Sequence, residues 1–287
     1  MSKTNHRQLV QPFLKWAGGK RQLLPDIVRH IPKQFGTYYE PFLGAGAVLF
    51  HLQPKRAVVN DINAELMNTY IVIRDDIDGL IADLKKHKNE KEYFYRLRNL
   101  DRQADYRQLS ATQRASRLIY LNKTCYNGLF RVNRHGFFNV PFGRYKNPQI
   151  VNEPVLRAVH QYLNSADITL LNTDFEQAVA TAQPGDFVYF DPPYDPVSDT
   201  SNFTDYSCGG FGKTEQKRLR DVFVALDRRG CKVLLSNSAT DFIKNLYDGY
   251  RIVTVQANRN INSDATKRGK VAEVLIMNYD PEQENGD

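Results

Sequence analysis

Four consecutive residues in the second half of the chain could hold a planar amine. Asp191-Pro192-Pro193-Tyr194 directly follow the apolar run Phe187–Phe190, which is typical of a buried strand. An amine attached to an aromatic ring is a poor nucleophile because its lone pair is delocalised into the ring. The Asp191 carboxylate and the Pro192 carbonyl could accept its two N–H protons and draw the lone pair towards an electrophile, while Tyr194 offers a face for stacking. A strand ended by proline and followed by a loop tyrosine would explain the same residues without any catalysis.

A glycine-containing turn lies near the start of the chain, at Glu40 to Gly46. Glycines between a strand and a helix let backbone N–H groups approach a ligand closely. Asp61 follows the next strand-like run, 17 positions after the first of these glycines, and could accept hydrogen bonds from ribose hydroxyls. The third glycine of a dinucleotide site is missing, and Ala17-Gly18-Gly19-Lys20 is followed by Arg21 rather than by Ser or Thr, so a phosphate loop is not predicted either. A nucleoside without phosphates fits better, although a structural turn with a helix-capping Asp would leave the same pattern.

The elements around these motifs alternate between strands and helices. Ala47 to Leu52 begins a helix after the glycine turn, and Asp105 to Asn122 and Thr214 to Arg229 are expected to be helical. The order of strand, turn, helix and strand is half of a doubly wound α/β sheet, in which ligands bind at the carboxyl ends of the strands. Strands are expected at Thr37–Glu40, Arg56–Asn60, Asp167–Leu171, Phe187–Phe190, Lys232–Ser236 and Val271–Asn278.

The middle of the chain is strongly basic. The whole chain has a net charge of +7, but Lys85 to Ile150 alone contains 15 Lys and Arg against 4 Asp and Glu, so the remainder is net negative. A solvated helix face could account for a few of these charges, whereas an excess of this size favours a phosphate-binding surface. We therefore predict one α/β domain, made of residues 1–73 and 151–287, that is interrupted by a basic, mostly helical insertion at residues 74–150.

The sequence argues against several other classes of protein. Its apolar runs are too short to span a membrane, and the polar N-terminus lacks the apolar core of a signal peptide. Cys125, Cys208 and Cys231 are widely separated and lack metal-ligand spacing, so neither a disulfide framework nor a metal site is predicted. We expect a cytoplasmic protein with reduced thiols.

Taken together, the motifs resemble those of the DNA adenine methyltransferase (Dam) family. The similarity extends from about Pro12 to Tyr279, with the motifs in the family's order. The resemblance implies the α/β fold of S-adenosylmethionine-dependent methyltransferases, with a doubly wound mixed sheet and an inserted, mostly helical DNA-recognition subdomain. It also implies transfer of a methyl group from S-adenosylmethionine to N6 of an adenine that is flipped out of double-stranded DNA. The matching blocks are residues 13–20, 40–46, 60–63, 126–133, 138–145 and 191–194.

The resemblance further implies a role for individual positions. Asp191, the Pro192 carbonyl and Tyr194 would be the catalytic residues and would hold the target base. The glycine turn would wrap the methionine moiety of the cofactor, Asp61 would hold its ribose, and Asp174 and Phe175 would flank its adenine. The cofactor-binding residues implied in this way are Trp16, Lys20, Glu40, Pro41, Phe42, Gly44, Gly46, Asp61, Asp174, Phe175 and Asp191.

The DNA-binding residues implied by the resemblance follow Asn122, apart from Lys15, which would contact DNA near the site. Arg131 would read a guanine in the major groove, because its forked guanidinium suits the O6 and N7 acceptors. Arg144 and Lys146 would contact phosphates. The side chains that would pack around or between bases are Tyr126, Asn127, Leu129 and Pro141. The family's usual site is the palindrome GATC, which we expect here.

Other expectations concern partners and loops. We expect a monomer, which a restriction endonuclease with the same recognition site could accompany without a stable complex. Pro196 to Gly212 resembles the family's segment that closes over the flipped adenine, and Asn262 to Lys270 is expected to be a loop beside the DNA.

Two alternative functions remain open at this point. A methyltransferase of RNA or of a protein amide could use the same motif, because Asp-Pro-Pro-Tyr can hold any planar amine. A DNA-binding regulator without activity could also have retained a methyltransferase fold. Methyl acceptance by DNA but not RNA would exclude the first, and cofactor binding would argue against the second.

Overall fold

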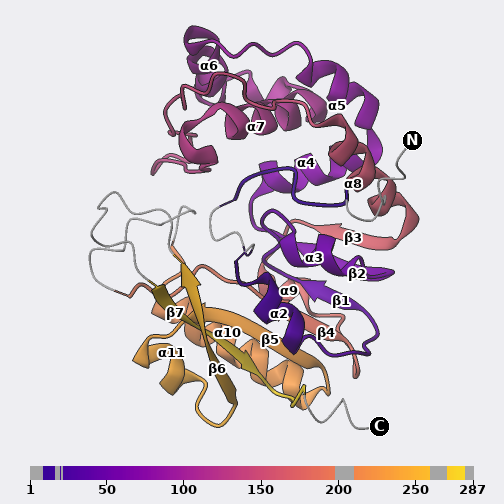
Figure 1. The fold of residues 1–287 in the computed structure, drawn as a ribbon, viewed down its shortest axis with the longest axis vertical. Coiled ribbons are helices and arrows are strands. Elements are labelled where there is room, and N and C mark those ends of the chain that lie inside the picture. The colour runs from indigo at the N-terminus through magenta and orange to yellow at the C-terminus, as the bar shows by residue number, and fades with distance from the viewer. Residues whose placement is uncertain (1–8, 17–19, 21, 198–209, 259–269, 282–287) are drawn as a thin grey trace.

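A mixed sheet of seven strands fills the lower part of the molecule in Figure 1. The computed structural model describes residues 9–16, 20, 22–197, 210–258 and 270–281. The strands lie in the order β3-β2-β1-β4-β5-β7-β6, of which the first five are parallel and β7 is antiparallel to both β5 and β6. Their bounds are β1 Tyr38–Glu40, β2 Arg56–Asn60, β3 Asp167–Leu171, β4 Phe187–Phe190, β5 Lys232–Ser238, β6 Arg251–Asn258 and β7 Lys270–Met277.

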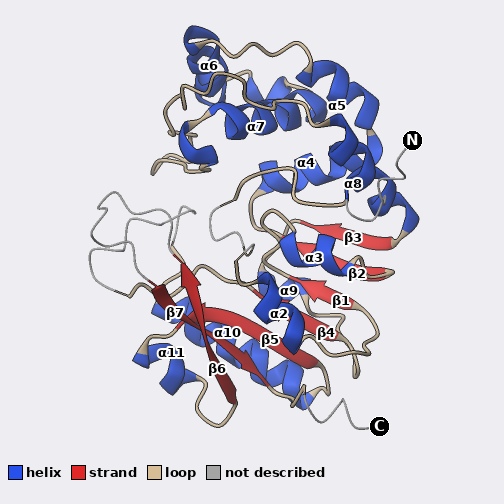
Figure 2. Cartoon of the chain, in the orientation of Figure 1, coloured by secondary structure: helices blue, strands red, loops and turns tan. Residues whose placement is uncertain are grey.

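Helices cover both faces of this sheet (Figure 2). The helices α2 and α3 share a core with Tyr38 and Tyr189 of the sheet, whereas α9, α10 and α11 share a second core with Tyr39 and Val188. Successive side chains of a strand point to opposite faces, so the two cores lie on opposite sides of the sheet. The prediction of a doubly wound α/β sheet is therefore confirmed. The bounds of these helices are α2 Leu24–His30, α3 Ala47–Leu52, α9 Phe175–Ala178, α10 Lys213–Arg228 and α11 Asp241–Leu246.

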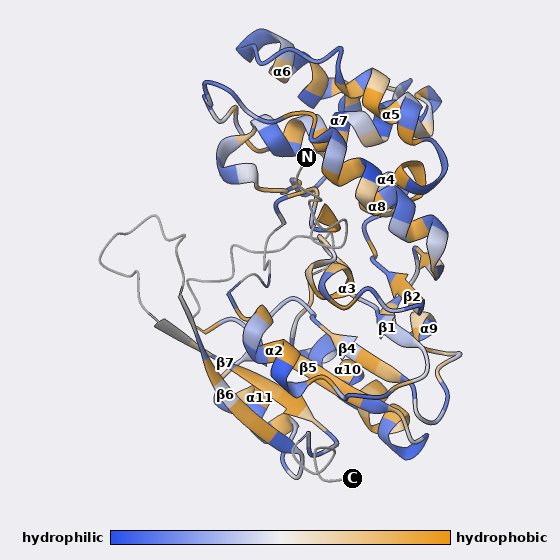
Figure 3. Cartoon of the chain, turned by 45° about the vertical axis from the view of Figure 1, so that its right-hand side comes forward, coloured by the Kyte–Doolittle hydropathy of each residue, from blue (hydrophilic) through white to orange (hydrophobic). Residues whose placement is uncertain are grey.

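The central strand β4 illustrates why the sequence forms this sheet. All four of its residues are buried, and a continuous apolar run is what a parallel strand covered on both faces requires. Figure 3 shows the strands of the sheet largely in orange, as apolar segments. β4 pairs with β1 on one side and with β5 on the other, which places Asp191 beside the end of β1.

A layer of helices lies above the sheet in Figure 1. The helices α4 and α8 pack against β3 as well as against other helices of the layer, so one continuous core joins the layer to one face of the sheet. The expected start of the insertion, residue 74, lies inside α4. The helices of this layer are α4 Ala64–Asp75, α5 Ile77–Leu84, α6 Lys91–Arg98, α7 Ala111–Thr124 and α8 Glu153–Ser165.

Two local predictions differ from the structure. The helix expected over Asp105 to Asn122 begins only at Ala111, because Ser110 Oγ accepts the N–H of Gln113 at 3.1 Å while the Gln113 side chain accepts the N–H of Ser110 at 3.0 Å. This capping box fixes the start of α7, and a short 3₁₀ turn precedes it. The strand β6 was not predicted; within the described part of the chain it lies at the edge of the sheet and pairs with β7.

None of the helices in the described ranges combines the length and the apolar character needed to cross a membrane.

Candidate active site

The predicted motifs meet at one edge of the sheet. The strands β3, β2, β1 and β4 are parallel neighbours, so their carboxyl ends lie side by side. The chain proceeds from β1 outward to β2 and β3 and then returns to β4 on the other side of β1, so the direction of winding reverses between β1 and β4. Such a reversal opens a crevice at the carboxyl ends of the two strands, which is the usual ligand-binding position in an open α/β sheet.

The turn after β1 is built around the buried carboxylate of Glu40, which is 2% exposed. Its Oε2 accepts hydrogen bonds from Tyr38 Oη at 2.9 Å and from the backbone N–H of Leu49 at 3.1 Å. Burial raises the pKa of Glu40 to about 8, with Asp191 adding to the rise and the two donors opposing it. Glu40 is therefore largely protonated at neutral pH.

The glycines of the turn have the left-handed backbone that their positions require. Gly44 has a φ of 49° and Gly46 a φ of 69°. A Cβ atom on Gly46 would lie 2.9 Å from Tyr70 Oη, and one on Gly44 would lie 3.0 Å from Cδ1 of Trp16. The turn therefore brings its backbone against these aromatic side chains in a way that only glycine permits.

Asp61, at the end of β2, is tied directly to this turn. Its Oδ2 accepts the N–H of Gly44 at 2.9 Å, and its Oδ1 accepts the N–H of Asn63 at 2.9 Å. Asn63 in turn caps α4 by accepting the N–H of Leu66. Burial raises the pKa of Asp61, and the two backbone donors counteract the rise. Each carboxylate oxygen keeps further acceptor capacity for a ligand hydroxyl.

An aromatic pair lies next to the ends of β1 and β3. The rings of Phe42 and Phe175 stack with their centroids 5.4 Å apart, and the Arg218 guanidinium lies 4.3 Å from the centroid of Phe175. Arg218 also pairs with the carboxylate of Asp174, which caps α9. The Asn60 amide donates to the carbonyls of Pro41 and Thr173, both at 3.0 Å, and so holds the two loops together.

A buried ammonium group lies at the end of β4. Lys20 is 7% exposed, and its Nζ lies 2.8 Å from Asp191 Oδ1. It also donates to Tyr194 Oη at 2.7 Å and lies 4.1 Å from the centroid of the Tyr194 ring. The Lys20 amino group thus contacts both the Asp191 carboxylate and the Tyr194 ring, which are the two groups predicted to hold the target amine.

Two further side chains complete this cluster. Ser236 Oγ donates to Asp191 Oδ1 at 3.0 Å, and Tyr194 Oη donates to Glu273 Oε2 at 2.8 Å. Burial raises the pKa of Asp191, while Lys20 and Ser236 oppose the rise. Burial also raises the pKa of Tyr194 well above its usual range, and the charges of Asp191 and Glu273 add to this, so the phenol is neutral.

A polar network fixes the loop that follows Asp191. The Gln216 amide, fully buried on α10, donates to the Pro193 carbonyl at 2.9 Å and accepts from Asn237 Nδ2 at 3.1 Å. Asn237 Oδ1 accepts the N–H of Asp195 at 3.0 Å, and Thr240 donates to the Asp195 carboxylate at 2.7 Å. The network limits how far the Asp-Pro-Pro-Tyr turn can move relative to α10 and β5.

The sequence analysis did not identify six residues of this cluster and network, namely Ser236, Glu273, Gln216, Asn237, Asp195 and Thr240. A signal was present for two of them. Gln216 is a polar residue in the apolar stripe of α10, which also contains Leu219 and Phe223, and Asn237 is buried within the polar end of the strand β5. Nothing in the sequence pairs Glu273 with Tyr194, which is 79 positions earlier.

Apart from Lys15, the residues assigned to DNA lie in a block of loops after α7. Asn127 and Arg144 have left-handed backbone, with φ of 56° and 54°, and an antiparallel bridge between Val132 and Phe138 makes a hairpin of residues 131–139. Arg131 Nε donates to Asn139 Oδ1 at 2.7 Å. Leu129 is half-buried, and the exposed members of the set are Lys15, Tyr126, Asn127, Arg131, Pro141, Arg144 and Lys146.

Asn122 joins this block to the N-terminal segment. Its Oδ1 accepts the N–H of Lys15 at 2.9 Å, and its Nδ2 donates to the carbonyls of Lys15 at 2.7 Å and Gly128 at 2.9 Å. The next residue, Trp16, stacks on Phe130 with centroids 4.8 Å apart. The segment that contributes Trp16 to the predicted cofactor site is thus held by the predicted DNA-binding block.

Some predicted positions lie outside the described residues. They are Ala17 to Gly19, Cys208, most of Pro196 to Gly212, and Asn262 to Lys270 except for the strand residue Lys270.

Comparison with known proteins identifies the family of this chain. Residues 16–261 match the family of D12 class N6 adenine-specific DNA methyltransferases. The type II methyltransferase M1.LlaDCHI of Lactococcus lactis subsp. cremoris is 45% identical over 272 residues, which cover 94% of this chain and 96% of that protein. The type II methyltransferase M.MjaIII of Methanocaldococcus jannaschii is 43% identical over 290 residues, covering 94% and 99%. A DNA adenine methylase of Vibrio cholerae is 37% identical over 270 residues, covering 92% and 95%. Because residues 16–261 match this family and these relatives are at least 37% identical over more than nine-tenths of the chain, the chain belongs to the D12 class of N6 adenine-specific DNA methyltransferases.

Proposed function

We propose that this adenine-specific DNA methyltransferase takes its methyl group from S-adenosylmethionine and transfers it to N6 of an adenine flipped out of duplex DNA, within the site GATC. The observation that carries this proposal is the position of the Lys20 ammonium, which lies 2.8 Å from Asp191 Oδ1 and 4.1 Å from the centroid of Tyr194. An amino group is therefore accommodated between the acceptor and the stacking ring that the reaction needs.

The residues at the strand ends fit S-adenosylmethionine. The Asp61 carboxylate has acceptor capacity for ribose hydroxyls, and the aromatic pair of Phe42 and Phe175 suits a purine. Trp16 and the turn from Glu40 to Gly46 would hold the methionine part, with Asp174 beside the cofactor adenine. When bound, the cofactor supplies an electrophilic methyl group on a sulfonium sulfur.

The chain's own residues prepare the amine. The Asp191 carboxylate and the Pro192 carbonyl accept hydrogen bonds from the two N6–H groups, so that the nitrogen lone pair points out of the ring plane. N6 gives up one of these protons when the methyl group is attached, and the Asp191 carboxylate is placed to take it. Tyr194 stacks on the flipped base. Glu273 accepts a hydrogen bond from the Tyr194 hydroxyl and so orients the Tyr194 ring. Lys20 has to turn away from Asp191 before the base can enter, because its Nζ lies where the amine would be.

Recognition of DNA is assigned to the insertion of residues 74–150. Asn139 holds Nε of Arg131, and the terminal amino groups of Arg131 have no other partner among the described residues. These groups would read a guanine in the major groove. Tyr126, Asn127, Leu129 and Pro141 would pack around the bases. Lys15, Arg144 and Lys146 would contact the DNA backbone.

We also propose that the enzyme acts as a monomer in the cytoplasm, on one strand at a time. Type II methyltransferases among its relatives support a companion restriction endonuclease with the same recognition site.

Methyl transfer to matched duplexes tests the proposal. The protein is incubated with radiolabelled S-adenosylmethionine and two duplexes that differ only in one GATC site, with Asp191→Asn as the test variant. Asp221→Asn is the control, because Asp221 is an exposed residue of α10. We expect label on adenine N6 of the GATC duplex alone, and a rate lower by on the order of 10²-fold or more in Asp191→Asn.

The other outcomes separate the parts of the proposal. Equal label on both duplexes would refute the GATC assignment, and label on RNA would revive the alternative substrate. An undiminished rate in Asp191→Asn would refute the assigned mechanism.

A further inference from the structure

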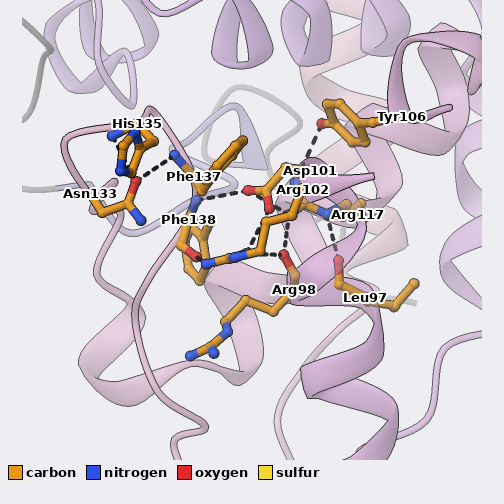
Figure 4. Close-up of polar contacts among 10 residues, drawn as sticks. All are labelled: Leu97, Arg98, Asp101, Arg102, Tyr106, Arg117, Asn133, His135, Phe137 and Phe138. Carbon is orange, nitrogen blue, oxygen red and sulfur yellow. Dashed lines mark hydrogen bonds and ion pairs between the residues drawn. The ribbon is translucent and has the colours of Figure 1, made fainter. Parts of the chain in front are cut away.

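The hairpin of residues 131–139 is anchored at its base on one carboxylate. Phe138, which is buried, closes the hairpin by its bridge to Val132. Its backbone N–H donates to Oδ2 of Asp101 at 2.7 Å (Figure 4). The N–H of the next residue, Asn139, donates to the Arg131 carbonyl at 3.0 Å. Asp101 thus holds the strand of the hairpin that lies opposite Arg131.

Two arginines surround the same carboxylate. Arg117 Nη2 lies 3.0 Å from Asp101 Oδ2, and Arg102 Nη1 lies 2.8 Å from Oδ1. Arg102 Nη2 also donates to the carbonyl of Phe138 at 2.9 Å. Both backbone polar groups of Phe138 are therefore held by one ion cluster, as Figure 4 shows.

This cluster is rigidly attached to the helical layer. Arg117, on α7, donates from Nε to the Leu97 carbonyl at 2.7 Å and from Nη2 to the Arg98 carbonyl at 2.8 Å. The side chains of Arg117 and Asp101 are 6% and 10% exposed. Buried charges that are paired and fully hydrogen-bonded tolerate little displacement, because separation would leave a desolvated charge without a partner. The cluster joins α7, the end of α6 and the hairpin into one unit.

We propose that Asp101 is a positioning residue that determines sequence specificity, by fixing the angle at which the hairpin presents Arg131 to DNA. The inference rests on the proposed function, in which Arg131 reads a guanine. Bidentate contact with a base edge requires the guanidinium to be placed within about 0.5 Å. A hairpin that could move at its base would lose this contact. Asn139 is both the neighbour of the anchored Phe138 and the partner of Arg131 Nε, so the anchor acts on the arginine through one residue.

The test compares Asp101→Asn with two controls in the same helical layer. Asp83→Asn removes a carboxylate of α5 that pairs with the exposed Lys86, which follows this helix. Leu80→Ala opens a buried position of α5, which packs against α7, and so lowers stability without touching the anchor. Methylation rates are measured for each variant on the GATC duplex and on duplexes with every single base-pair substitution. Arg131→Ala identifies the base pair that Arg131 reads.

We expect Asp101→Asn to lose about tenfold or more in discrimination at the base pair to which Arg131→Ala is sensitive. Cofactor affinity, followed by the fluorescence of Trp16, the single tryptophan of the chain, should stay within about twofold. Unchanged discrimination, or the same loss in Leu80→Ala, would overturn the inference. If Arg131→Ala changes no discrimination, the role of Arg131 in the proposed function fails and the inference about specificity fails with it, whereas anchoring of the hairpin by Asp101 is tested separately by amide exchange.

Amide hydrogen exchange gives a readout that does not depend on activity. The N–H of Phe138 should exchange faster in Asp101→Asn than in the unmodified enzyme. The N–H of Gly143, which donates to the Thr124 carbonyl at 2.8 Å, should be unaffected. Equal protection of Phe138 in both proteins would show that Asp101 does not anchor the hairpin.

Discussion

Burial keeps the carboxylic acid of Glu40 largely neutral within the predicted cofactor site. Burial moves its pKa from the usual 4.5 to about 8. A group that binds its proton more tightly in the folded state stabilises the fold fully below its unfolded pKa, and this contribution is lost as the pH rises through the folded pKa. Glu40 therefore makes the free enzyme less stable as the pH rises from about 4.5 to about 8.

Replacing Glu40 by Gln should remove this pH dependence. The amide keeps an oxygen for Tyr38 Oη and the Leu49 N–H but has no proton to lose. Between pH 5 and 8, we expect the free energy of unfolding of the unmodified enzyme to fall relative to Glu40→Gln by up to about 1.4 kcal/mol per pH unit. Urea unfolding at pH 5, 6.5 and 8 measures the difference. Parallel curves for the two proteins would show that Glu40 is ionised at neutral pH.

The helix α10 and the strand β5 hold the Asp-Pro-Pro-Tyr turn through Gln216. In Gln216→Leu, the buried Asn237 Nδ2 loses its partner, and an unsatisfied buried donor destabilises by about 1–3 kcal/mol. The part-buried Pro193 carbonyl also loses the donor that holds it. We expect a loss of stability in this range together with a lower kcat, since the turn carries Asp191. Urea unfolding and single-turnover methylation provide the two measurements.

Lys217→Leu is the matched control, because the next residue of α10 is exposed and lies outside the network. Its stability should change by less than about 0.5 kcal/mol. A stable Gln216→Leu enzyme with normal kcat would mean that the hydrogen bond from Gln216 is not needed to hold the turn.

Most elements could be predicted because their signals are local. The buried strand Phe187–Phe190 is an apolar run, and the turn at Gly44 and Gly46 is marked by its residue types. The start of α7 was misjudged because the apolar stripe extended past the capping box at Ser110. The strand β6 was missed although its run from Ile252 to Val255 consists of β-branched residues, which favour a strand.

The contacts between side chains around the predicted site were harder to predict from the sequence. The contact between Tyr194 and Glu273, and the clamp of Gln216 on Pro193, join segments that are distant along the chain. A single sequence contains no record of such pairs. The resemblance to the family supplied the candidate residues, and the order of the strands explains why those after β1, β2, β3 and β4 lie together.

At the scale of the whole molecule, the uneven charge predicts how DNA binding depends on salt. Each phosphate that the protein neutralises contributes about −0.9 to the slope of log K against log salt concentration. Replacing both Arg144 and Lys146 by Gln should therefore reduce the magnitude of the slope by about 2, with little change in base preference. Fluorescence anisotropy of a labelled duplex between about 50 and 200 mM salt measures the slope.

Lys33→Gln serves as the control for that measurement, because Lys33 is an exposed lysine outside the insertion. It should leave the slope unchanged. An equal reduction in both proteins would mean that overall charge, rather than the loops after α7, sets the salt dependence.

The segment just before α2 limits how recognition of a new DNA sequence can be engineered or acquired. Within six positions it contributes Lys15 to the predicted DNA surface, Trp16 to the predicted cofactor site and Lys20 to the Asp191 cluster. The side chain of Asn122, on α7, hydrogen-bonds to both the backbone N–H and the carbonyl of Lys15, and the Phe130 ring stacks on the Trp16 ring. The insertion therefore cannot be exchanged independently of the segment before α2. A chimaera that receives residues 74–150 from a relative should be active only when residues 9–20 are transferred with them.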